Sequence, residues 1–148
     1  MDTTPIEARL GRIRKSVLIL GELQRLTYEA FIGDERNIST AERHLQLAIQ
    51  AALDIGQHIL SELMVEAPSS YADVFTKLGK VGAVPTDFAE RLADMARFRN
   101  ILVHLYLEVD PEKVYYIVQH NLEDFERFAQ YVTDFVARHT EHGKVSAL

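Results

Sequence analysis

The chain has 148 residues, a formal net charge of −6 and no cysteine. The absence of cysteine excludes disulfides, thiolate catalysis and cysteine-ligated zinc or iron–sulfur sites. The negative charge argues against broad attraction to nucleic acid, although Arg91, Arg97 and Arg99 form a local group of cations in the sequence.

The first two predicted helices each begin at a capping box. Thr4–Glu7 has the pattern of a capping box with proline at the first helical position, and apolar residues then recur every three to four positions. Gly33-Asp34 predicts the end of this helix near Phe31. Ser39–Glu42 is a second capping box, and the apolar periodicity after it predicts a long helix to about Leu63.

A short helix and a third long helix are predicted next. Pro68-Ser69-Ser70 ends the preceding helix, a short helical segment covers residues 73–80, and residues 82–85 form a loop. Thr86 or Asp87 is then suited to cap a third long helix.

The last predicted helix begins at Asp110-Pro111-Glu112, and its apolar periodicity continues to Val132. From about Thr140 we expect a frayed tail. Because no segment alternates with period two, we predict an all-α, up-and-down bundle of four long helices plus a short helix. It would form a single domain over residues 1–148, with a core from about residue 5 to 138.

The sequence predicts a soluble protein. Its first residues lack the basic and apolar regions of a secretory signal, and no uninterrupted apolar run approaches the ~20 residues needed to span a bilayer. We therefore expect a cytoplasmic protein with no membrane association.

Chemically competent side chains are concentrated in the segment Arg99–Tyr106, which we call the signature segment. Arg99 can hold a phosphate with paired donors, and His104 can transfer protons near neutral pH. Asn100 lies one helical turn before His104 and could fix its tautomer. Arg99 and His104 are roughly 140° apart on an ideal helix, so they meet at one phosphate only if the helix ends or a second subunit completes the site.

Arginine and histidine around a phosphodiester are sufficient for cleavage of RNA without a metal, because the attacking 2′-hydroxyl belongs to the substrate. The alternative is a solvated arginine, a partly buried histidine and a core tyrosine. No metal or cofactor is expected. His44 and His58 are interpreted as polar boundary residues, and His139 and His142 would chelate a metal only if the tail were helical.

The signature segment resembles that of HEPN-domain proteins, and more narrowly the HepT toxins, whose pattern is Arg, four residues, His, one residue, Tyr. Arg99, His104 and Tyr106 match each element. Residues 42–50 and 54–59 resemble the second helix of that family, and the run from Tyr71 to Arg99 also fits. The resemblance covers roughly residues 5–138.

The resemblance implies a HEPN-like fold and the toxin of a type VII-like toxin–antitoxin system. Such a toxin is a metal-independent endoribonuclease that acts as a homodimer, with two signature segments across a two-fold cleft. Arg99 would stabilise the pentacoordinate phosphate, His104 would act as general acid or base, and Asn100 would orient His104. Asp54 is a candidate to support His104 from the second helix.

The resemblance also implies regulation at Tyr106. The partner would be a minimal nucleotidyltransferase antitoxin that transfers AMP onto this tyrosine, which places negative charge beside Arg99 and opposes RNA binding. Two alternatives remain. One is a non-catalytic HEPN module that binds a nucleotide or a nucleotidyltransferase, and the other is a helical interaction protein without a ligand.

Overall fold

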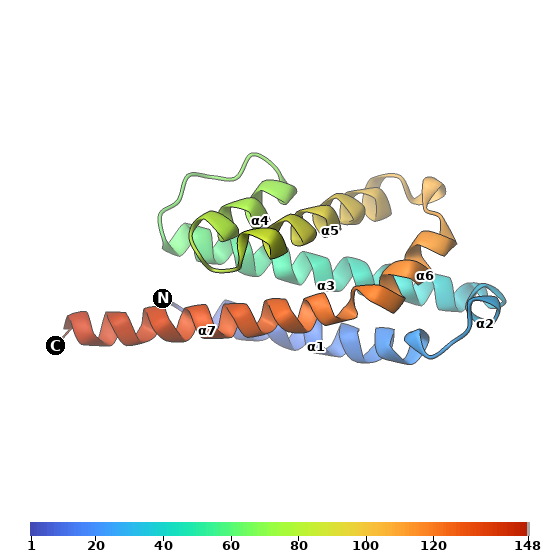
Figure 1. Cartoon of the computed structure of the whole chain (residues 1–148), viewed down its shortest axis with the longest axis horizontal. Helices are drawn as coiled ribbons and strands as arrows, with labels where there is room; N and C mark the ends of the chain where they lie inside the picture. Colours follow the sequence, from blue (N-terminus) through green and yellow to red (C-terminus); the bar gives the residue numbers. More distant parts are fainter. Residues whose placement is uncertain (148) are drawn as a thin grey trace.

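The computed structural model describes the backbone of residues 1–147 and the side chains of residues 1–105 and 107–140. This part of the chain is all-α, so the predicted fold class is confirmed. Figure 1 labels its helices, which are α1 Thr4–Gln24, α2 Tyr28–Ile32, α3 Glu35–Glu62, α4 Tyr71–Lys80, α5 Thr86–His104, a short 3-10 helix Tyr106–Glu108, α6 Pro111–His120 and α7 Leu122–Ala147.

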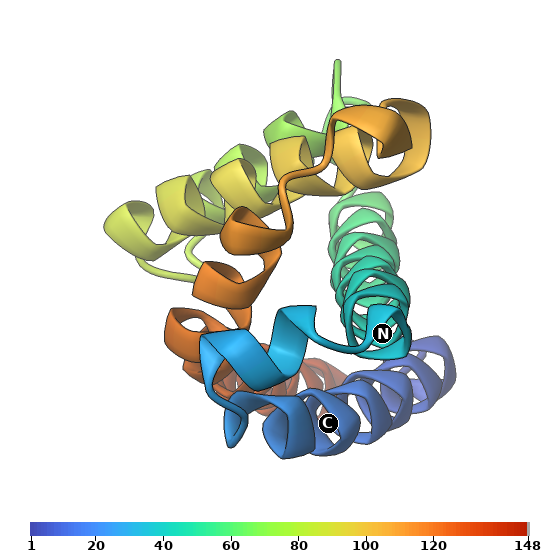
Figure 2. The ribbon, with the colours of Figure 1, turned by 90° about the vertical axis from the view of Figure 1, so that its right-hand side faces the viewer.

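The four long helices α1, α3, α5 and α7 surround a common apolar core. Helix α3 packs against α1 on one side and against α4 and α5 on the other, and α7 packs against α1. Figure 2 shows α3 between α1 below it and α5 above it. The polar residues of α3 that lie away from the core are half-buried or exposed.

The first predicted helix is interrupted, which corrects the prediction that it continues to Phe31. Helix α1 ends at Gln24, and a new N-cap forms at Thr27, whose Oγ1 accepts a hydrogen bond from the Ala30 N–H at 3.2 Å. The Tyr115 hydroxyl donates to a carbonyl in this turn, at 2.7 Å. The break is therefore held by a contact from a distant segment, which local periodicity does not reveal.

The predicted start of the first helix at Thr4 is confirmed, whereas the predicted start of the second helix at Ser39 is wrong. At α1, Asp2 Oδ1 accepts from the N–H of Thr4 at 3.1 Å, so an aspartate before the box supplies the acceptor. At α3, Asp34 is the N-cap and accepts from the Arg36 N–H at 3.0 Å. The Ser39–Glu42 segment is therefore inside the helix, because the carboxylate of Asp34 already caps its first turn.

The second half of the chain follows the prediction more closely. The short helix and the loop after it are present, and Asp110 caps α6 by accepting from the Glu112 N–H at 3.0 Å. The cap of α5 is Pro85 and not the predicted Thr86 or Asp87.

The predicted last helix is divided in two. It breaks at Asn121 into α6 and α7. Helix α7 then extends to Ala147, past the predicted fraying point near Thr140. His142 of the candidate metal pair lies outside the described side chains.

The core also holds α4 against α3. Phenylalanine rings that are essentially inaccessible to solvent fill its centre. Helix α4 approaches α3 at Gly56, where a Cβ atom would lie 2.7 Å from a methyl group of Val74. This close approach positions the first residues of α4, which border the site described next. No helix in the described part of the chain is long and apolar enough to cross a bilayer.

Candidate functional site

The signature segment lies at the carboxyl end of α5, as the sequence predicted. The helix is regular through His104 and ends at Leu105, whose backbone has left the helical region (φ −126°, ψ 39°). Leu105 still donates its N–H to the Ile101 carbonyl at 2.9 Å. The 3-10 helix from Tyr106 follows directly, and the side chain of Tyr106 lies outside the described part of the structure.

An open groove of 420 Å³ lies beside this helix end. Asn100 and His104 of α5 line it, together with Gln57 of α3 and residues 68–71 at the start of α4. His104 is exposed to solvent in the groove, so its imidazole is accessible to a ligand. Three separate helices therefore contribute polar or aromatic groups to one surface depression.

Arg99 lies beside this groove, where it contacts two of the residues that line it. Its Cζ atom is 4.9 Å from the centre of the Tyr71 ring, a cation–π contact, and its Nη1 donates to Asn100 Oδ1 at 3.3 Å. The Nε atom is buried and has no hydrogen-bond partner among the described residues. The guanidinium is therefore held by two residues of the groove, while part of its donor capacity is unused.

Asn100 makes its described side-chain hydrogen bond with Arg99 and lines the groove together with His104. The asparagine was expected to orient the imidazole through its place one turn earlier. In the structure it connects the arginine to the groove wall, and its action on His104 stays a prediction.

Asp54 lies elsewhere than the sequence interpretation placed it. Its Oδ1 accepts from Gln50 Nε2 at 2.9 Å, and its Oδ2 lies 3.6 Å from Arg9 Nε. Among the described side chains these are its polar partners, and His104 is not one of them. Because Arg9 belongs to α1, the carboxylate is directed toward α1 and away from the end of α5.

The three arginines that were predicted to form a local group of cations differ in their partners. Arg91 Nη2 lies 2.8 Å from the buried Asp124, and Arg97 Nη1 lies 2.7 Å from Asp94. Both charges are compensated by carboxylates. Arg99 has no ion-pair partner among the described side chains and is therefore the member of this group that remains able to bind an anion.

Tyr71 and Gln57 were not identified from the sequence. Both reach the groove from helices other than α5, so no spacing rule connects them to Arg99 or His104. An aromatic residue directly after the cap of α4 was the available signal for Tyr71, and it is too common to be specific.

The helical geometry separates the two reactive groups. Helix α5 stays regular from Arg99 to His104, so their directions differ by roughly 140° around its axis. Arg99 stacks on Tyr71, whereas His104 enters the groove. One chain can therefore hold a phosphate and move a proton, but it does not direct both groups at the same atom.

Comparisons with known proteins give a consistent assignment. The family model described as Ribonuclease HepT-like matches residues 6–132. A tRNA nuclease HepT of Aphanizomenon flos-aquae is 28% identical over 131 residues, which cover 88% of this chain and 89% of that protein. An mRNA nuclease HepT of Shewanella oneidensis is 38% identical over 85 residues, or 57% of this chain and 64% of that protein.

A solved structure agrees with the sequence matches. The tri-AMPylated Shewanella oneidensis HEPN toxin, in complex with MNT antitoxin, has a TM-score of 0.82 and 28% identity, covering 90% of this chain and 99% of that one. The matched residues include the complete signature segment and all helices from α1 into α7. The chain therefore belongs to the HepT-like ribonuclease family.

Proposed function

We propose that this protein is the toxin of a type VII-like toxin–antitoxin system and cleaves RNA as a metal-independent endoribonuclease. The observation that carries the proposal is an exposed His104 in a groove whose lining residues Tyr71 and Asn100 hold Arg99, in a chain whose relatives are HepT nucleases. A groove at a helix end is accessible to a single-stranded substrate.

The chemistry follows from the two side chains. The 2′-hydroxyl of the RNA attacks the adjacent phosphorus, and a histidine accepts its proton. The guanidinium offsets the charge of the pentacoordinate phosphate. The bond to the 5′-oxygen breaks, that oxygen takes a proton from a histidine imidazolium, and the products are a 2′,3′-cyclic phosphate and a 5′-hydroxyl. Every atom that reacts comes from the substrate or from these two residues.

A homodimer would complete the site. Two copies related by a two-fold axis would bring a second Arg99 and His104 to the same RNA strand. This arrangement would also concentrate positive charge where a monomer with a net charge of −6 lacks it.

The first experiment measures cleavage of RNA by purified protein in EDTA. We expect cutting by the wild type, and a loss of at least ~100-fold in the Arg99→Ala and His104→Ala variants, since each removes a group that acts in the transition state. Arg97→Ala is the matched control, because Arg97 is an exposed arginine of the same helix that pairs with Asp94. Full cleavage by His104→Ala would contradict the assignment.

The second experiment tests regulation at Tyr106 by a minimal nucleotidyltransferase. The Tyr106 hydroxyl would attack the α-phosphorus of ATP, lose its proton and release pyrophosphate. Mass spectrometry after incubation with the partner and ATP should locate AMP on Tyr106, and the modified protein should no longer cut RNA. Tyr106→Phe should cut RNA and resist inactivation; AMP on a different residue would refute this role.

The non-catalytic HEPN module remains the second candidate, favoured by the pairing of Arg91 and Arg97 with acidic residues. In that case Arg99 would only hold a phosphate, and His104 would be structural. A folded wild type that is inert toward RNA but binds the nucleotidyltransferase tightly would establish this alternative.

A further inference from the structure

A second set of cationic side chains lies where α1 packs against α3. Two contacts define this packing: Ser16 Oγ lies 3.1 Å from His44 Nδ1, and Arg9 Nε lies 3.6 Å from Asp54 Oδ2. Arg12 is three residues after Arg9 and four before Ser16, so it occupies the same face of α1 between the two contacts. It therefore lies over the segment of α3 between His44 and Asp54.

Arg9 is paired with Asp54, whereas the charges of Arg12 and Arg43 are not compensated by a described carboxylate. Arg12 Nε is buried and lacks an acceptor among the described residues, and the buried Gln50 Oε1 on the facing segment of α3 lacks a donor. Neither Arg12 nor Arg43 forms an ion pair with a described carboxylate. Burial lowers the pKa of His44, and the charges of both arginines lower it further. We call the two arginines Arg12 and Arg43, together with the neighbouring uncharged His44, the α1–α3 cation cluster.

The polar face of α3 connects this cluster to the groove. Gln50, Asp54 and Gln57 follow one another at four and three residues, so they form one stripe along the helix. Gln57 lines the groove beside His104. From His44 to Gln57 the helix rises by about 20 Å, at ~1.5 Å per residue, which is the length of several nucleotides. Figure 2 shows this helix flanked by α1 and α5.

We propose that the α1–α3 cation cluster is a second phosphate-binding site, which holds the RNA backbone several nucleotides from the bond that is cleaved. This inference rests on the proposed nuclease function. Unpaired guanidinium groups are suited to phosphate, and a short row of them lets a protein with a negative net charge bind one RNA strand. The cluster contributes to binding of a long substrate and takes no part in the chemical step.

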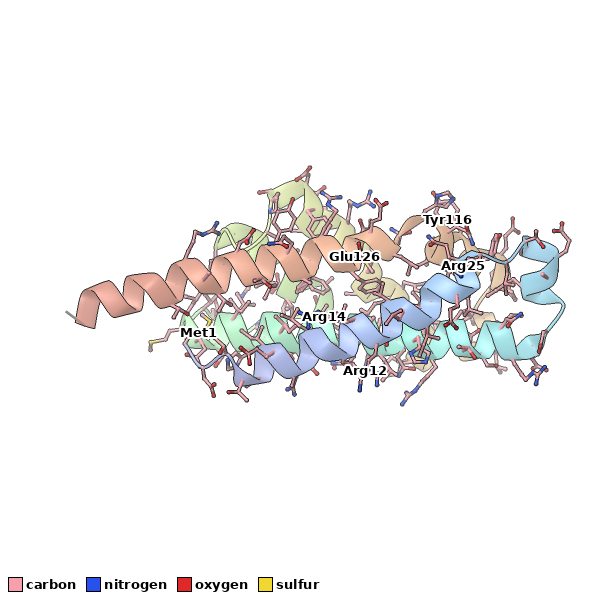
Figure 3. The ribbon with its side chains drawn as sticks, turned by 90° about the horizontal axis from the view of Figure 1, so that it is seen from below. Met1, Arg12, Arg14, Arg25, Tyr116 and Glu126 are labelled. Atoms are coloured by element: carbon pink, nitrogen blue, oxygen red, sulfur yellow. The ribbon has the colours of Figure 1, made fainter. Side chains whose placement is uncertain are left out.

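The test compares two double variants that remove the same charge. Arg12→Gln/Arg43→Gln changes the cluster, and Arg14→Gln/Arg25→Gln is the control, because Arg14 and Arg25 line a different groove between α1 and α7. Figure 3 shows Arg12 and Arg14 on opposite edges of α1. Cleavage is measured on a dinucleotide, which is too short to reach the cluster, and on a long single-stranded RNA.

The cluster variant should lose about tenfold in kcat/KM on long RNA and remain unchanged on the dinucleotide. In the inactive His104→Ala background, its salt dependence of RNA binding should fall by about 1.4 in slope, or ~0.7 for each phosphate that the cluster no longer neutralises. The control variant should retain most of its kcat/KM on long RNA and most of its salt dependence of RNA binding. Arg12→Lys/Arg43→Lys should restore binding, and melting temperatures should exclude loss of fold.

Three results would overturn the inference. The first is an equal loss in both double variants, which indicates a general charge effect. The second is unchanged binding of long RNA by the cluster variant. The third is normal RNA binding with lost binding of the nucleotidyltransferase, which would make this surface a protein interface. If the wild type binds long RNA but cleaves neither substrate, the nuclease proposal fails while the binding measurements still decide the role of the cluster.

Discussion

At the residue scale, the environment of Arg99 determines which of its donors can meet a phosphate. Its flat face stacks on Tyr71, and one Nη donates to Asn100. A cation–π contact uses the π face of the guanidinium and leaves its second Nη group available for hydrogen bonds. We therefore expect Tyr71 to act as a positioning residue, which holds the guanidinium beside the groove.

Substitution of Tyr71 should separate positioning from chemistry. Tyr71→Leu removes a cation–π contact worth ~1 kcal/mol and should lower kcat/KM for RNA about fivefold. Tyr71→Phe keeps the ring and should retain wild-type activity. Both variants are characterised by steady-state kinetics and by a pH–rate profile. The profile should keep its wild-type shape, because His104 is unchanged. Equal losses in both variants would indicate that the hydroxyl, and not the ring, is required.

Sequence reasoning named the residues of the candidate site that are close together in the chain. Arg99, Asn100 and His104 are found by their functional groups, their spacing and a family resemblance. Tyr71 and Gln57 are brought to them by the packing of α4 and α3 on α5, which depends on the whole fold.

At the element scale, local signals predicted the boundaries that local hydrogen bonds create. The start of α6 at Asp110 and the loop before α5 follow from aspartate, proline and glycine acting on their own neighbours. The positive φ of Gly82, 80°, is an example, because glycine adopts it without strain. Local sequence signals likewise predicted that the signature segment lies at the end of α5.

The boundaries that were missed depend on tertiary contacts. Apolar periodicity in the sequence continues through Asn121, yet the helix is interrupted at this residue. Asp124, only 2% exposed, accepts hydrogen bonds from Arg91 Nη2 at 2.8 Å and from Asn121 Nδ2 at 3.0 Å. The junction of α6 and α7 is therefore tied to α5. Arg91, a charged residue of α5, thus helps to fix where α7 begins. Because its guanidinium is paired with Asp124, Arg91 is not free to bind RNA.

At the scale of the whole molecule, the geometry of α5 indicates how two copies of the chain would assemble to form a catalytic site. A regular helix directs Arg99 and His104 roughly 140° apart, so a site that uses both on one phosphate needs them from different copies. We expect each catalytic site of the dimer to combine the arginine of one protomer with the histidine of its partner.

Mixing two inactive variants tests this expectation. After subunit exchange between Arg99→Ala and His104→Ala proteins, half of the dimers are mixed, and each mixed dimer contains one site with an intact arginine and an intact histidine. RNA cleavage should therefore recover to about a quarter of the wild-type rate. A site built within one protomer would show no recovery, because neither variant retains both residues.

The converse mixture provides the control. When the wild type exchanges with the Arg99→Ala/His104→Ala double variant, a shared site loses one partner in both halves of every mixed dimer. The mixed dimers should then be inactive, and cleavage should fall to about half of the value for the same amount of undiluted wild-type dimer. A site within one protomer would keep its full activity, since the wild-type chain carries both groups. Only an arrangement across the two-fold axis yields recovery in the first mixture and loss in the second.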